Sequence, residues 1–187
     1  LQDGEGVQVE LDMACQFTPG PIPTYNVVAE IPGTSKADEV VIVSAHLDSW
    51  DGPGSHGIVD NGTGSSVTIE AARLLSAALA RTGQRPLRTI RFILWTGEEQ
   101  GLLGSKAYVA RLKQEGTLDK VSVVIVDDGG TNYQGGLGAA DVQAEMLAAA
   151  TAPITNQFYD ATDGTFLNVN VQGMGKSIRT HGGSDHA

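Results

Sequence analysis

Three short runs of apolar residues organise the chain, at 40–45, 90–95 and 121–126. A continuous run of this length is typical of a strand that is covered on both faces. Between the first two runs, residues 63–81 carry apolar side chains at three- and four-residue spacing, which predicts an amphipathic helix. Further helices are predicted at 105–114 and 141–150. This alternation predicts an α/β domain with a largely parallel central sheet.

Two further strands are predicted before these runs. Residues 7–17 alternate apolar and polar side chains, and the proline-rich stretch 18–23 then breaks the pattern. Residues 25–31 form the second predicted strand, which ends at Pro32 and Gly33. We expect these two strands to form an antiparallel extension at one edge of the sheet.

Length and composition restrict the function. With 187 residues, 41% of them hydrophobic and 18% charged, we expect a single globular domain over residues 1–187. The formal net charge of −10 argues against a nucleic-acid partner, which normally requires a basic face. No apolar run approaches the ~20 residues of a membrane span, so no membrane partner is expected. Cys15 is the single cysteine, and we expect it to pack as a small buried hydrophobic residue.

Ligand-type side chains follow each of the three buried strands. His46 follows the first, Glu98 and Glu99 the second, and Asp128 the third, while Asp60 precedes the long helix. In open α/β sheets the ligand crevice lies at the carboxyl ends of the strands. If the strands are parallel, the side chains of His46, Glu98, Glu99 and Asp128 converge at one edge.

A lone acidic residue after a strand is most often a helix cap or a solvated loop residue. Several carboxylates packed together without a cation would repel one another, whereas a divalent ion makes the same cluster favourable. Imidazole and carboxylate without thiolate suit zinc, with manganese or cobalt as alternatives. Two ions that share a bridging carboxylate account for the number of acidic residues.

At these positions the sequence resembles a known family. Residues 46–51 read HLDSWD, residues 60–64 read DNGTG, and residues 95–105 read WTGEEQGLLGS. Together they resemble the M28 family of co-catalytic zinc peptidases, in particular its secreted aminopeptidases and plasma glutamate carboxypeptidases. The resemblance implies a three-layer α/β/α sandwich with a mixed, mostly parallel sheet. It also implies a peptide substrate and a secreted or periplasmic location.

The resemblance also assigns metal ligands. It implies that His46 binds one zinc ion, that Asp60 bridges the two ions and that Glu99 binds the other. Asp128 matches the family's next ligand. Asp127 is the neighbouring alternative, because the apolar run before it gives no periodicity to decide between them.

Two further residues have implied roles in catalysis. The resemblance makes Glu98 the general base that deprotonates the attacking water. Asp48 lies two residues after His46, as in the family's His-x-Asp motif, and would orient that histidine. Trp50 and Tyr133 are candidates for the wall of the substrate pocket, although packing in the core or in a loop is the better explanation of each.

One departure from the family concerns the fifth ligand, a histidine downstream of an element that residues 183–187 match. His186 is a candidate for it, but the resemblance favours a place in the pocket wall; His181 is a weaker candidate. We therefore expect the chain to be a fragment that lacks the family's C-terminal segment.

The resulting prediction is a di-zinc exopeptidase that acts near a chain terminus. A related zinc enzyme that cyclises or deacylates an amide is an alternative, because the substrate-selecting loops cannot be ranked from the sequence. A binding module that has lost catalysis is the other alternative. The presence of all the matched ligands and of the base argues against that alternative.

Overall fold

The computed structural model describes residues 8–52, 54, 56–129, 136–176 and 185. Its centre is a four-stranded sheet in the order β1-β3-β2-β4. The strands are β1 (Val27–Ile31), β2 (Lys36–His46), β3 (Arg88–Trp95) and β4 (Val121–Val126). β2 is parallel to both β3 and β4, and β1 is antiparallel to β3. The sheet is mixed and mostly parallel, as predicted.

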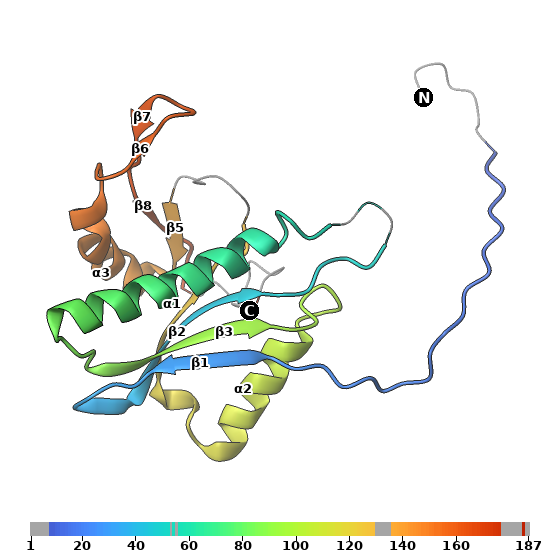
Figure 1. The fold of residues 1–187 in the computed structure, drawn as a ribbon, viewed down its shortest axis with the longest axis horizontal. Coiled ribbons are helices and arrows are strands. Elements are labelled where there is room, and N and C mark those ends of the chain that lie inside the picture. The colour runs from blue at the N-terminus through green and yellow to red at the C-terminus, as the bar shows by residue number, and fades with distance from the viewer. Residues whose placement is uncertain (1–7, 53, 55, 130–135, 177–184, 186–187) are drawn as a thin grey trace.

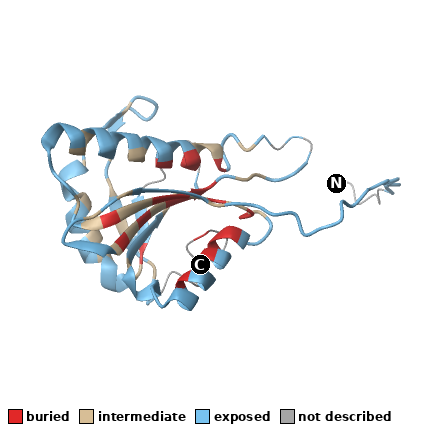
Figure 2. Cartoon of the chain, turned by 60° about the horizontal axis from the view of Figure 1, so that its bottom comes forward, coloured by how far each residue is buried: buried red, intermediate tan, exposed pale blue. Residues whose placement is uncertain are grey.

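Helices cover both faces of this sheet. Figure 2 shows α1 (Gly62–Thr82) on one face and α2 (Leu103–Glu115) on the other, which confirms the three-layer α/β/α arrangement. The 3-10 helix η1 (Leu118–Lys120) leads from α2 into β4. Within the described residues, no helix is both long enough and apolar enough to cross a membrane.

The rest of the described chain lies beyond β4. Strand β5 (Gly136–Ala139) pairs in parallel with β8 (Asn170–Gly173), and α3 (Asp141–Thr151) packs against both. The 3-10 helix η2 (Ala152–Ile154) follows α3, and β6 (Tyr159–Asp160) and β7 (Thr165–Phe166) form a small hairpin. The helix predicted at 141–150 is therefore confirmed within one residue.

The core lies between the sheet and α2. Ile93 is fully buried, and Trp95 next to it meets the Tyr108 ring edge to face at a centroid distance of 5.3 Å. The core cluster consists of Val40, Ile42, Ile93, Trp95, Tyr108 and Leu112. On the opposite face, the buried positions of α1 are the small residues Gly64, Ser65 and Thr68, which let this helix approach the end of the sheet closely.

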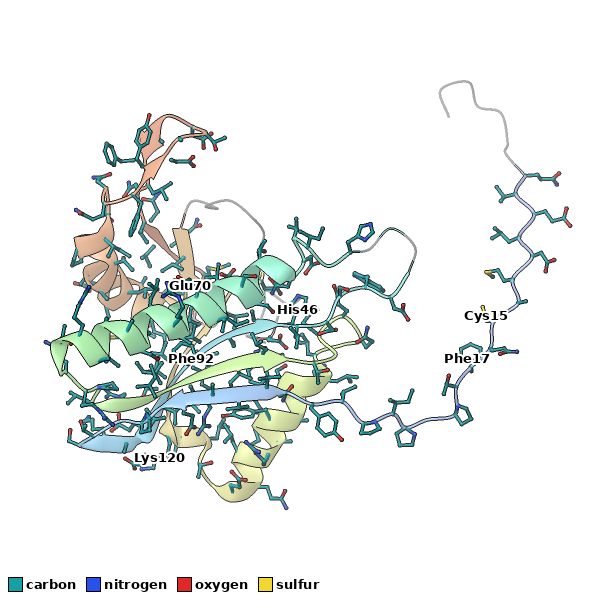
Figure 3. The ribbon with its side chains drawn as sticks, in the orientation of Figure 1. Cys15, Phe17, His46, Glu70, Phe92 and Lys120 are labelled. Atoms are coloured by element: carbon teal, nitrogen blue, oxygen red, sulfur yellow. The ribbon has the colours of Figure 1, made fainter. Side chains whose placement is uncertain are left out.

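The N-terminal segment departs from the prediction. Residues 8–26 form no strand, and Figures 1 and 3 show them extending away from the sheet. Leu11 and Met13 are 74% exposed, and Cys15 is exposed rather than buried. The predicted strand at 7–17 and the predicted burial of Cys15 are therefore wrong over the described residues. The alternating pattern supplies a face to bury, but a strand also needs a hydrogen-bonding neighbour, which this segment does not have.

Candidate metal centre

The predicted ligand residues meet at the carboxyl ends of three neighbouring strands. His46 is the last residue of β2, where it pairs with Trp95 of β3, and Figure 3 shows it beneath the first turn of α1. Glu98 and Glu99 follow β3, and Asp128 follows β4. Because β2 is parallel to both β3 and β4, the residues that follow these three strands lie at the same edge of the sheet.

The His46 ring lies at the middle of this cluster and is 1% exposed. Its Nε2 atom is 3.0 Å from Oδ1 of Asp60 and 3.1 Å from Oδ1 of Asp128. Its Nδ1 atom is 2.9 Å from the backbone oxygen of Asp48. One ring nitrogen therefore faces two carboxylates, while the other is held by the backbone, the usual arrangement of a metal-binding histidine.

The start of α1 positions Asp60. Asn61 is the N-cap of this helix, and its Oδ1 accepts the backbone N–H of Gly64 at 2.9 Å. Its Nδ2 donates to the backbone oxygen of Asp127 at 2.8 Å. A Cβ atom on Gly64 would lie 2.3 Å from Asn61 Oδ1 and 2.4 Å from that oxygen, so only glycine fits. The start of α1 is thus tied to the end of β4.

Asp127 and Asp128 differ in what their backbone and side chains contact. The backbone of Asp127 is used twice, since its N–H donates to the backbone oxygen of Ser44 and its oxygen accepts from Asn61. The Asp128 carboxylate lies against His46. Of the two alternatives left open by the sequence, Asp128 is the one that the geometry brings to the cluster.

Asp48 fixes the pair of glutamates. One oxygen of its carboxylate accepts the backbone N–H of Glu98 at 3.0 Å, and the other accepts the backbone N–H of Glu99 at 3.2 Å. The nearest oxygen of this carboxylate is 3.8 Å from Nδ1 of His46, so the histidine is held by the Asp48 backbone oxygen and not by its side chain. The sequence gives no sign of this contact with residues fifty positions away.

The cluster carries more negative charge than its surroundings neutralise. The pKa of Glu98 is raised to about 7: burial is the largest cause, the charge of His46 opposes it, and the charges of Asp128, Asp185 and Glu99 add to it. Burial also raises the pKa of Glu99. Burial of the His46 ring opposes its protonation, but the negative charges around it prevail and raise its pKa. A centre of this kind takes up protons when no other cation is present.

The donor set fits a divalent cation. Two groups have ligand atoms within 4.8 Å of one another: His46 with Asp60 and Asp128, and His46 with Glu98 and Glu99. The Oε1 atom of Glu99 is buried and has no hydrogen-bond partner. Among the described residues, no lysine or arginine forms an ion pair with any of these carboxylates. A buried, unpartnered oxygen beside an imidazole and further carboxylates suits zinc.

Other predicted residues lie apart from the cluster or cannot be placed. Tyr133, His181 and His186 lie outside the described residues. Asp185 is described and is 8% exposed; its Oδ1 accepts a hydrogen bond from Ser105 Oγ at 2.6 Å, and its Oδ2 is buried without a partner. In the sequence Asp185 is only one residue of the matched element 183–187, and no local pattern predicts a buried acid whose charge acts on Glu98.

Comparisons with known proteins show the family of this chain. The sequence model of peptidase family M28 matches residues 26–187. Carboxypeptidase Q of Bos taurus is 37% identical over 175 residues, which cover 90% of this chain and 35% of the relative. The chain spans about a third of the length of the curated relatives that it matches.

Two solved structures share the fold. One is a peptidase M28 precursor from Shewanella amazonensis, with a TM-score of 0.64 and 32% identity, over 87% of this chain and 32% of that one. The other is a zinc aminopeptidase from Bacillus subtilis, with a TM-score of 0.59 and 27% identity, over 86% of this chain and 36% of that one. Residues 26–187, which match the family model, include all the elements that position the ligand cluster.

Proposed function

The chain belongs to peptidase family M28, and on that premise we propose that it carries most of the catalytic centre of a zinc exopeptidase that hydrolyses peptide bonds next to a chain terminus. The observation that carries the proposal is the position of His46 Nε2 between the carboxylates of Asp60 and Asp128, with the paired Glu98 and Glu99 beside it. We propose that residues 1–187 belong to one catalytic domain of a longer protein. A secreted or periplasmic location stays a prediction.

The ligands are proposed to serve two ions. His46 and Asp128 would hold one ion and Glu99 the other, and Asp60, at the start of α1, would be shared between them. When bound, two zinc ions polarise the scissile carbonyl and lower the pKa of a water molecule toward ~7. The unpartnered Oε1 of Glu99 supports its place among the ligands, because a buried carboxylate oxygen is costly unless something binds it.

Glu98 is proposed as the general base. Glu98 is 9% exposed, and in the metal-free protein burial is the largest cause that raises the pKa of its carboxyl to about 7, so this group exchanges a proton near neutral pH. Glu98 takes the proton from the attacking water and passes it to the nitrogen of the leaving amine. The peptide bond breaks as the amine receives this proton.

Asp48 acts as a positioning residue. Its carboxylate fixes the backbone of both glutamates, and its backbone oxygen fixes the His46 ring. One residue therefore sets the base and a ligand relative to each other, without contact with the substrate.

The first experiment uses a dipeptide, because its only peptide bond lies next to both termini and serves an aminopeptidase or a carboxypeptidase alike. We expect the zinc-loaded protein to release free amino acids from Leu-Leu, a chelator to stop the release, and added zinc to restore it. The exposed Glu70 on α1 offers a matched control, since Glu70→Gln should leave the rate unchanged. Release that persists at full rate after the metal is removed, or zinc binding without any release, would contradict the proposal.

A further inference from the structure

Glu98 and Glu99 lie in a turn that links the end of β3 to the start of α2, residues 96–104, which we call the glutamate turn. Its last residues donate their backbone N–H groups to oxygens at its start at 2.8–2.9 Å: Gly101 and Leu102 to Glu98, Leu103 to Gly97, and Gly104 to Thr96. Leu102 has a φ of 62°, a left-handed conformation that is costly for a residue other than glycine. Such a conformation persists only where surrounding contacts hold it. The glutamate turn therefore depends on contacts from outside itself.

Asn26 joins the two ends of the glutamate turn. It directly precedes β1, and its Oδ1 accepts the backbone N–H of Thr96 at 3.1 Å while its Nδ2 donates to the backbone oxygen of Gly104 at 2.9 Å. Thr96 follows β3, and Gly104 lies in the first turn of α2. Figure 1 shows the start of β1, the end of β3 and the start of α2 at the same edge of the sheet. One side chain from a distant segment therefore spans the turn from outside.

The fit around Asn26 is close. A Cβ atom on Gly104 would lie 2.2 Å from Oδ1 of Asn26 and 2.6 Å from the backbone oxygen of Thr96, so only glycine lets the three segments meet. The two hydrogen bonds also need an acceptor and a donor on one short side chain. A carboxamide supplies both, whereas an ionised carboxylate of the same size only accepts. The contact therefore depends on the amide of Asn26.

We propose that Asn26 is a second positioning residue of the metal centre. Asp48 fixes the middle of the glutamate turn through the N–H groups of Glu98 and Glu99, and Asn26 fixes its two ends. Together they hold the two glutamates in place for their proposed roles as base and ligand. Because Asn26 bonds to the backbone of the turn, it acts through the glutamates and not on the substrate. The inference rests on the proposed function.

A comparable contact at the opposite end of the sheet separates this role from a purely structural one. Thr89 lies near the start of β3, away from the metal centre. Its Oγ1 donates to the backbone oxygen of Ala37 at 2.7 Å and accepts the backbone N–H of Gly33 at 3.1 Å. Thr89→Val removes both hydrogen bonds and keeps the branched shape of the side chain. It therefore measures what the loss of two such bonds does to the fold alone.

The test compares Asn26→Ala with Thr89→Val. Both should lower the melting temperature of the metal-free protein, because each loses two hydrogen bonds. Only Asn26→Ala should lower the affinity for zinc, measured by calorimetric titration, and the kcat for Leu-Leu, each by about 10-fold, with an unchanged KM. Zinc affinity and kcat that fall equally in both variants, or in neither, would overturn the proposal.

A second variant decides the matter if Asn26→Ala does not fold. Asn26→Asp keeps the acceptor for the Thr96 N–H, but at neutral pH it places an oxygen without a proton against the oxygen of Gly104. It therefore breaks the bond to α2 and leaves the shape of the side chain almost unchanged. Zinc affinity and kcat should both fall, as in Asn26→Ala. If both keep their unaltered values, the span across the turn has no role in the centre.

The two proposals fail in different ways. If the unaltered protein binds zinc and does not cut Leu-Leu, the proposed function fails, and the zinc affinity of the variants still tests Asn26. If the unaltered protein cuts Leu-Leu and the Asn26 variants match it in zinc affinity and kcat, the function stands and the role of Asn26 is wrong.

Discussion

The carboxylate of Asp48 accepts the backbone N–H of Glu98 at 3.0 Å, across fifty positions of sequence. Its other oxygen accepts the N–H of Glu99 in the same way. Asp48 follows β2 and the glutamates follow β3, so this contact joins the ends of two strands. The position of Glu98, the proposed base, therefore depends on Asp48, which follows the same strand as His46. This contact holds the ends of β2 and β3 together.

Replacing the proposed base tests its role directly. Glu98→Gln keeps the size of the side chain but cannot accept a proton at neutral pH. We expect turnover of Leu-Leu to fall at least ~100-fold while the zinc content stays the same. Both quantities can be measured on one preparation, by amino-acid release and elemental analysis. Unchanged turnover would remove Glu98 from the mechanism.

Asp48→Asn tests the positioning role. An asparagine can accept only one of the two backbone N–H groups, and its own amide N–H₂ faces the other donor. We expect zinc affinity to fall by about 10–100-fold, with a lower kcat and an unchanged KM. Asp51→Asn is the matched control, because Asp51 is an exposed residue of the same segment. If both variants behave like the unaltered protein, the Asp48 contact has no role in the centre.

Asp60→Ala tests the two-ion arrangement. The Asp60 side chain is 63% exposed and Asn61, not Asp60, caps α1, so the substitution should leave the fold of the metal-free protein intact. We expect the zinc content per chain to fall, since the bridging carboxylate is lost. The melting temperature without metal should match that of Asp51→Ala. Full retention of zinc by elemental analysis contradicts a bridging role.

Zinc binding should release protons. In the metal-free protein the pKa of Glu98 is about 7 and that of His46 is raised, so both carry protons in part of the population near neutral pH. A metal ligand must be deprotonated, and the ion also favours the charged form of the neighbouring base. We expect the calorimetric enthalpy of zinc binding at pH 6.5 to differ between buffers of different ionisation enthalpy. The difference should become smaller in Glu98→Gln. Identical enthalpies in all buffers would show that no protons are released.

The same shift sets the sign of a stability effect in the metal-free protein. The folded-state pKa of Glu98, about 7, lies above its ordinary value of 4.5. The folded state therefore binds more protons than the unfolded chain between these values, so the contribution of Glu98 to stability is present below pH 4.5 and is lost as the pH rises through 7. The Glu98→Gln protein should lack this part of the pH dependence in denaturant titrations.

Much of the site follows from local sequence patterns. The apolar runs at 40–45, 90–95 and 121–126 lie in β2, β3 and β4, and the helical spacing at 63–81 lies in α1. Once these strands are parallel, the residues after them must share an edge, which is why the convergence of His46 with Glu98, Glu99 and Asp128 was predictable.

Contacts between distant segments were not predictable in the same way. The sequence could not choose between Asp127 and Asp128, because the choice depends on which side chain the end of β4 turns toward His46. It assigned Asp48 to the histidine alone, whereas the carboxylate binds the backbone of the glutamate pair. Neither the N-cap at Asn61 nor its second hydrogen bond to the end of β4 was predicted from the sequence.

The sequence by itself determined which segments become strands and helices of the central domain and which residue types follow them. The spacing of apolar residues and the helix caps that determine this act over a few neighbouring residues. Tertiary structure alone decided that Cys15 and the segment around it stay exposed, and that Trp50 lies on the surface and not in the core. It also decided which carboxylate oxygens lie against the ring nitrogens of His46. Those outcomes depend on how the strands align with one another and on whether a segment has a neighbouring strand with which to form hydrogen bonds. Both are set by segments far apart in the chain, and no local pattern records them.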